Sequence, residues 1–329
     1  MRRRGLIAAV IGAVVIIALA VTVYFLTLPP PLPDKVRVGY EPFISGLPVA
    51  YIKENKLAER EGLNIEWVEF PNPDDMNTAF GVGQLDIELP LSVHTAAEFR
   101  GAGRNIVLVG ASLRGLQSVL VKPDSPFTSL QDLRGKVYAI LDQPDDVSPV
   151  LEYAGLPNLE KSASKVLTGP PPVLPEIMAK GDADFISIFD PFTSLLLVTG
   201  QARELADVNQ VWRQKTGYDL VFTGIGVQSA FLDRYPEAVR KIVKIWNEAV
   251  DWIHNNPDEA MKRYASLTRL PDSPEAIAVY KERIVPLYLR SDAWNLDNVA
   301  LNIRIIRDAG AISQNAVDDP RVLIREVRP

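Results

Sequence analysis

The stretch Lys35–Pro48, KVRVGYEPFISGLP, predicts where the folded part of the chain begins. Its first residues alternate, with Val36 and Val38 on one face, which is typical of a β-strand. A glycine and a loop follow, and apolar residues then recur at helical spacing. A strand that leads through a loop into a helix is how an open α/β sheet presents a ligand site at its carboxyl edge. If this is more than an ordinary connecting loop, three side chains lie at such an edge: Tyr40, Glu41 and Phe43.

Composition limits the possible functions. The chain has 329 residues, 47% hydrophobic and 23% charged, which is ordinary for a globular protein and long enough for two lobes. It has no cysteine, so disulfides, thiolate metal sites and cysteine nucleophiles are excluded. With only two histidines, we predict no metal site and no cofactor. The formal charge of −6 argues against nucleic acid as a partner.

The amino terminus has the pattern of a membrane segment. Three arginines at positions 2–4 precede an uncharged, almost wholly apolar run from Gly5 to Leu28, which is long enough to span a bilayer. The run ends in bulky residues with no small-residue cleavage site, so we predict an uncleaved anchor over residues 1–28, with a cleaved signal sequence as the alternative. The arginines place this end in the cytoplasm and the remainder outside. Residues 29–34 are a proline-rich linker.

The rest of the chain alternates between strand and helix patterns, which predicts largely parallel sheets. The longest helix is expected over Pro236–Asn256, where apolar residues recur at helical spacing. The sequence contains no GxxxxGK[ST], HExxH, CxxC or GxSxG motif. Nothing resembles an assembled catalytic set, so we predict that the protein is not an enzyme.

Five segments, taken in order, resemble the periplasmic solute-binding proteins of ABC importers, in the branch that takes sulfonates, taurine, nitrate and thiamine-precursor pyrimidines. The segments cover most of residues 35–266 and read VRVGYEP with GLPVAYIKENKLAEREGLNIEWVEF, GVGQLDI, LVKPDSPFTSLQDLRGKVYAI, AKGDADFISIFDPF and YPEAVRKIVKIWNEAVDWIHNNPDEA.

This resemblance implies a two-lobe α/β fold of the type II periplasmic-binding-protein class, with a ligand held in the cleft. We expect lobe I to comprise residues 35–120 and 222–329, and lobe II residues 121–221. The crossing segments, near Leu116–Lys122 and Leu220–Gln228, would form a hinge. The resemblance also implies delivery of the ligand to a membrane permease with a cytoplasmic ATPase, and we expect a monomer.

The resemblance places the cleft at loops that follow strands. Besides the first loop, it points to these side chains: Leu91, Ser92, His94, Ser112, Asp145, Asp146, Ser148, Asp190 and Phe192. Simpler interpretations exist for some of them. Adjacent acids such as Asp145 and Asp146 are often a solvated turn or a helix start, and His94 would most simply be a partly exposed helix residue.

The predicted ligand class follows from a loop in which this chain differs from the family that it resembles. Many relatives have a Gly-Ser type loop at a helix start, which suits an anion. This chain has Asp142-Gln143-Pro144-Asp145-Asp146 instead. Acids at several predicted strand ends favour a neutral or cationic organic ligand, such as a pyrimidine-like heterocycle that stacks on aromatic rings. The alternatives are a binding protein for an aliphatic sulfonate, taurine or nitrate, an enzyme of thiamine-precursor pyrimidine synthesis, and a sensor ectodomain.

Overall fold

The computed structural model describes residues 32–43, 45–142 and 145–329. The predicted anchor over residues 1–28, and most of the linker, lie outside the described residues. Within the described part of the chain, no helix is both long enough and apolar enough to cross a bilayer.

The first lobe is built on a five-stranded sheet in the order β2-β1-β3-β10-β4. The predicted first strand is confirmed as β1, and it pairs in parallel with both β2 and β3. Strand β10 is antiparallel to its neighbours β3 and β4, so the other four strands share one direction. The strands are β1 (Val36–Tyr40), β2 (Ile65–Glu69), β3 (Ile87–Ser92), β4 (Ile106–Arg114) and β10 (Val221–Gln228).

The second lobe repeats this plan with the order β7-β6-β8-β5-β9. Here β5 is the antiparallel strand, between β8 and β9. Each lobe therefore has a mostly parallel sheet, as predicted. The strands are β5 (Gln117–Val121), β6 (Val137–Leu141), β7 (Lys165–Gly169), β8 (Phe185–Phe189) and β9 (Arg203–Asp207).

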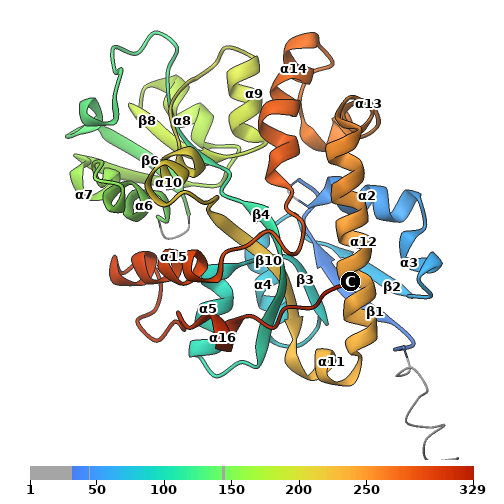
Figure 1. Cartoon of the computed structure of the whole chain (residues 1–329). Coiled ribbons are helices and arrows are strands. Elements are labelled where there is room, and N and C mark those ends of the chain that lie inside the picture. The colour runs from blue at the N-terminus through green and yellow to red at the C-terminus, as the bar shows by residue number, and fades with distance from the viewer. Residues whose placement is uncertain (1–31, 44, 143–144) are drawn as a thin grey trace, which may run out of the picture.

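The crossings between the lobes are short. Strand β5 belongs wholly to the second sheet, so the first crossing lies at Gly115–Leu116, a few residues before the expected boundary at residue 120. The return crossing lies between the end of α10 and the start of β10, next to the expected boundary at residue 221. In Figure 1 both crossings run through the middle of the molecule.

Helices cover both sheets. Those of the first lobe are α2 (Gly46–Glu54), α3 (Leu57–Arg60), α4 (Pro73–Gly81), α5 (Val93–Gly101), α11 (Ser229–Arg234), α12 (Pro236–Asn255), α13 (Pro257–Thr268), α14 (Pro274–Val279), α15 (Leu296–Asp308) and α16 (Pro320–Leu323), with the irregular turns η2 (Tyr280–Ile284) and η3 (Val285–Leu287). Those of the second lobe are η1 (Leu130–Leu133), α6 (Val147–Tyr153), α7 (Leu159–Ser162), α8 (Leu174–Lys180), α9 (Phe192–Val198) and α10 (Val208–Thr216).

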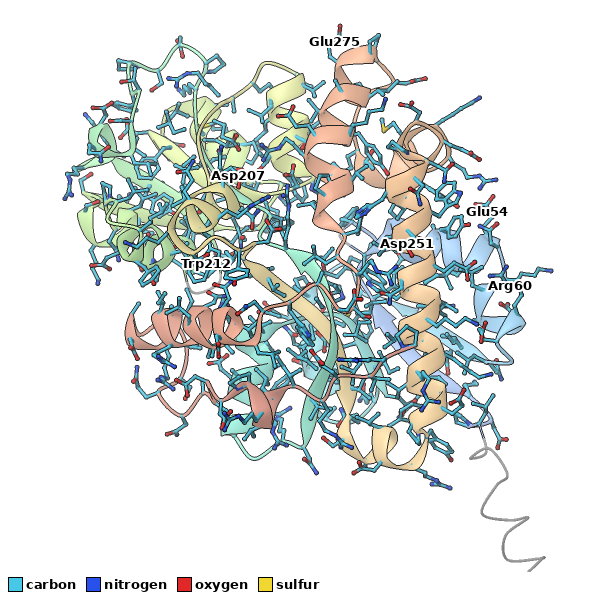
Figure 2. All side chains as sticks on the ribbon, viewed as in Figure 1. Glu54, Arg60, Asp207, Trp212, Asp251 and Glu275 are labelled. Carbon is cyan, nitrogen blue, oxygen red and sulfur yellow. The ribbon has the colours of Figure 1, made fainter. Side chains whose placement is uncertain are left out.

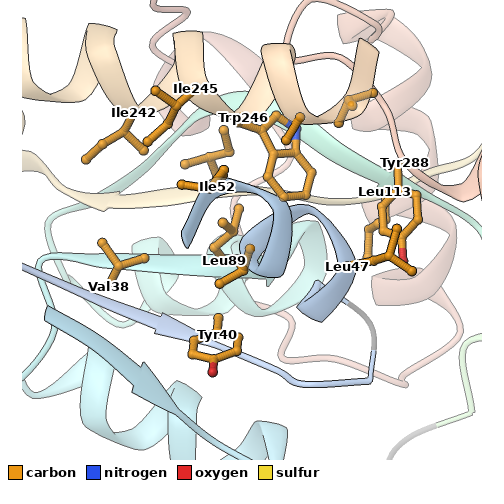
Figure 3. Close-up of a cluster of buried hydrophobic side chains, with 14 of the residues drawn as sticks. Val38, Tyr40, Leu47, Ile52, Leu89, Leu113, Ile242, Ile245, Trp246 and Tyr288 are labelled. Atoms are coloured by element: carbon orange, nitrogen blue, oxygen red, sulfur yellow. The ribbon is translucent and has the colours of Figure 1, made fainter. Parts of the chain in front are cut away.

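The long helix α12 anchors the core of the first lobe, as its apolar spacing predicted. Trp246 is fully buried, and its indole N–H donates to the carbonyl oxygen of Leu289 at 2.9 Å. Figure 3 shows it above Ile52 and Leu89, which belong to the same apolar cluster. The helix is amphipathic, so one face covers the sheet while the other stays polar.

Two carboxyl-terminal helices contact both lobes, although the whole segment 222–329 was expected in lobe I. Helix α14 packs beside α9, and α15 packs on both α5 and α6. Ile306 of α15 lies in the same apolar cluster as Trp212 of α10, which Figure 2 labels in the second lobe. The carboxyl-terminal region therefore forms part of the contact between the lobes.

Candidate functional site

A cavity of about 200 Å³ lies between the two lobes. Its walls come from β3, α4 and α5 of the first lobe and from β6, β8 and the start of α6 of the second. Among the described residues that line it there is no lysine and no arginine, whereas five acidic side chains do line it: Glu41, Glu88, Glu98, Asp145 and Asp146. The described lining therefore presents carboxyl groups with no basic side chain beside them.

Glu41 follows β1 and is held against β3 by a buried serine. The hydroxyl of Ser45 lies 3.1 Å from the carbonyl oxygen of Glu41 and 2.8 Å from that of Leu89, and it accepts from the Glu41 N–H at 3.2 Å. The Glu41 side chain is only 6% exposed. Burial, reinforced by the negative charge of Asp74, raises the pKa of Glu41 to about 8.

Asp145 and Asp146 begin α6 on the opposite wall. Asp145 accepts from the backbone N–H groups of Val147 and Ser148 and from the Ser148 hydroxyl, so it closes the first turn of the helix. The helix-start interpretation is correct for this residue, although Asp145 is buried rather than solvated. Asp146 accepts from the Gln117 amide at 2.9 Å, and burial followed by the charge of Asp145 raises its pKa to about 7.

His94 lies in the first turn of α5. Ser92 caps this helix by accepting from the His94 N–H at 3.2 Å, as predicted. The expectation of a partly exposed His94 is wrong, because the side chain is buried against Phe222 of β10. Burial lowers the pKa of His94 to about 4, so the ring is neutral at neutral pH. His94 therefore offers no positive charge to a ligand.

Of the side chains that the sequence pointed to, Glu41, Ser92, His94, Asp145 and Asp146 line the cavity. Four others do not line it and have partners within the protein. Tyr40 donates to Glu69, Ser112 shares a hydrogen bond with Thr223, Ser148 holds Asp145, and Leu91 is in the apolar core. As ligand contacts, these four stay predictions.

The remaining three predicted residues have partners elsewhere between the lobes. The guanidinium of Arg269 lies over the ring of Phe43 at 3.9 Å and near that of Phe192 at 5.1 Å. Asp190 pairs with Arg283 at 3.2 Å. None of these three lines the cavity. The two rings expected to stack on a ligand therefore contact an arginine of the protein itself.

Sequence reasoning missed several residues of the lining. The most important is Glu88, the second residue of β3, together with Gln117, Phe189, Phe222 and Thr223. The sequence predicted a short strand over Leu85–Leu89 and gave no role to Glu88. Its neighbours across the sheet, Gly39 and Gly226, are known only from the strand pairing in the structure.

The described residues include no group of three or more histidine, aspartate or glutamate side chains placed to hold a metal ion. The described lining combines acidic side chains, a neutral imidazole, hydroxyl and amide groups, two phenylalanine rings and aliphatic side chains. This chemistry suits the binding of a small organic molecule.

Two sheets of this strand order, short crossings and a cavity between the lobes define the fold of the solute-binding proteins of ABC importers. The sequence profile of the NMT1/THI5-like family matches residues 57–260. Because this is more than half of the chain, the protein belongs to that family.

Relatives and solved structures agree with this assignment. Two proteins named as aliphatic sulfonates-binding, from Bacillus subtilis strain 168 and Escherichia coli strain K12, are each 24% identical, over 72% and 78% of this chain and 70% and 78% of their own length. The crystal structure of the periplasmic aliphatic sulphonate-binding protein SsuA from E. coli has a TM-score of 0.74 at 19% identity, covering 90% of this chain and 94% of that one. SsuA from Xanthomonas axonopodis pv. citri, bound to MOPS, has a TM-score of 0.72 at 20% identity, covering 90% and 99%.

Proposed function

We propose that this protein is the extracytoplasmic solute-binding component of an ABC importer, held at the membrane by residues 1–28. It would capture a small organic ligand between its lobes and deliver it to a permease with a cytoplasmic ATPase. The family, the fold and the cavity between the lobes support this function. The alternative of a pyrimidine-synthesising enzyme is not retained, because the relatives and structural neighbours are named as binding proteins.

The ligand is proposed to be neutral or cationic and rich in hydrogen-bond donors. One observation carries this step: the lining has five acidic side chains and, among the described residues, no lysine or arginine. Buried carboxylates without partners are costly, so a ligand with N–H groups is their natural complement. Phe189 and Phe222 add apolar surface that suits a flat ring or a short chain.

The names of the relatives favour a sulfonate instead. A sulfonate is an anion, and proteins usually bind anions with arginine, lysine or helix amino termini. Arg114 and Arg283 line a separate cavity of about 490 Å³, where each is paired with an acid, Asp219 at 3.9 Å and Asp190 at 3.2 Å. The acidic lining therefore favours the cationic ligand over the sulfonate.

A matched panel tests the ligand class by thermal shift of the full-length protein. n-Butylamine, 1,4-diaminobutane and 4-aminopyrimidine are compared with butanesulfonate and taurine. A ligand that binds only the folded state at a hundredfold excess over its Kd stabilises that state by about 2.7 kcal/mol. We expect stabilisation by at least one amine and none by butanesulfonate. Stabilisation by the sulfonates alone would show that the relatives' ligand class applies here.

Ligand binding is also expected to close the lobes about the two crossings at Gly115–Leu116 and Gly217–Leu220, since such short segments can absorb the change in backbone dihedrals. Small-angle scattering should then record a smaller radius of gyration at saturation. An unchanged radius with a bound ligand would contradict closure.

A further inference from the structure

Glu88 occupies an unusual position for an acid. It is the second residue of β3, a central strand of the first sheet, and it is 1% exposed. Its partners across the sheet are Gly39 on β1 and Gly226 on β10. A Cβ atom at either glycine would come within 2.5 Å of a leucine side chain. A larger residue at either of the two positions that flank Glu88 would therefore require a leucine side chain to move.

The carboxylate of Glu88 has no partner within the described part of the chain. Both of its oxygens are buried, and neither has a hydrogen bond. Glu88 lines the cavity together with Glu41, which is 6% exposed. An unpaired buried carboxylate destabilises a fold, and one that faces a cavity is able to gain a partner from a ligand.

No lysine or arginine is found among the described residues that line the cavity around Glu88. Glu41 comes from the loop after β1, Asp74 from α4, and His94 and Glu98 from α5, while Asp145 and Asp146 face the cavity from the second lobe. Burial, followed by the charge of Glu41, raises the pKa of Glu88 well above its ordinary value. Glu41, whose pKa is raised to about 8, is mostly protonated at neutral pH, and the raised pKa of Glu88 favours its protonated form as well.

We propose that Glu88 and Glu41 form a subsite for an ammonium group, and that the ligand is therefore a primary or secondary organic amine. This rests on the proposed function and names the ligand class of the same cavity. The ammonium donates its N–H groups to the carboxylate of Glu88, which releases any proton it holds to solvent. Because the pKa of Glu88 is raised, we expect binding to release a proton and to strengthen as pH rises, by at most about tenfold per pH unit.

Calorimetry on the full-length protein tests the subsite with n-butylamine and 1,4-diaminobutane as probes. Titrations near neutral pH in phosphate and in triethanolamine, a tertiary amine, report the protons released, because the two buffers differ in ionisation enthalpy. We expect Glu88→Gln to lower amine affinity about tenfold to a hundredfold and to abolish proton release, because a charge-assisted hydrogen bond is lost. Glu66→Gln is the matched control, since Glu66 lies on β2 of the same sheet and is exposed. It should leave affinity within about twofold.

The outcomes separate the subsite from the wider function. If the wild type binds an amine but Glu88→Gln, shown to be folded by circular dichroism, binds it within about twofold as tightly, the subsite is wrong while the ligand class stands. If the wild type binds butanesulfonate and no amine, both are wrong. If neither n-butylamine nor 1,4-diaminobutane binds at about 10 mM, a concentration that reveals even weak affinity, the subsite is also wrong.

Discussion

Replacing Arg283 by alanine is expected to lower the free energy of unfolding by about 3–5 kcal/mol, because it leaves a buried carboxylate without its partner. Arg283 comes from the turn η2 and reaches the second lobe. Its guanidinium lies 3.2 Å from Asp190, donates to Ser118 at 2.9 Å and donates to Glu204 at 3.1 Å. The side chain of Asp190 is only 2% exposed, and its other partner is Ser194, whose N–H and hydroxyl both donate to it, so Arg283 is its ion-pair partner.

Urea unfolding of the wild type and the variant measures this effect. The control is Arg290→Ala, which removes an ion pair to Asp251 of α12 that is about half exposed on both sides. Figure 2 labels Asp251 on that helix. The control should lose less than about 1 kcal/mol. Adding Asp190→Asn to Arg283→Ala should restore part of the loss, because the amide carries no charge. If Arg283→Ala and Arg290→Ala lost the same free energy of unfolding, a buried contact of Arg283 between the lobes would be contradicted.

The Arg283–Asp190 pair also illustrates what the sequence could not provide. Asp190 ends a predicted strand, and the carboxyl ends of parallel strands are where ligands bind, so it was a reasonable candidate. Its partner lies 93 residues further along the chain, in an irregular turn without a clear sequence pattern. Pairing over such a distance depends on how α14 packs beside α9, which neither periodicity nor spacing reveals.

The sequence predicted some of the residues that line the cavity and missed others. Glu41, Asp145 and Asp146 follow strands, so the rule about strand ends found them. Glu88 lies within a strand, so the rule about strand ends did not find it. It belongs to β3, a central strand with helices over both faces of the sheet. Residue patterns within one strand cannot show which strands flank it.

Replacing Glu88 by methionine is expected to stabilise the empty protein by about 1–3 kcal/mol near pH 8, because an unpaired buried carboxyl group gives way to an apolar side chain of similar volume. Since folding raises the pKa of Glu88, its contribution favours the folded state in acid and is lost as pH rises through the folded-state pKa. The stability difference between variant and wild type should therefore be larger at about pH 8 than at about pH 5, by at most about 1.4 kcal/mol per pH unit. Urea unfolding at both pH values checks this, with the exposed Glu66→Met within about 0.5 kcal/mol of the wild type as control. The same variant should lose amine binding. If the variant were less stable than the wild type at both pH values, Glu88 would have a structural partner. The idea that the protein keeps an unpaired acid in the cavity at a cost in stability would then be wrong.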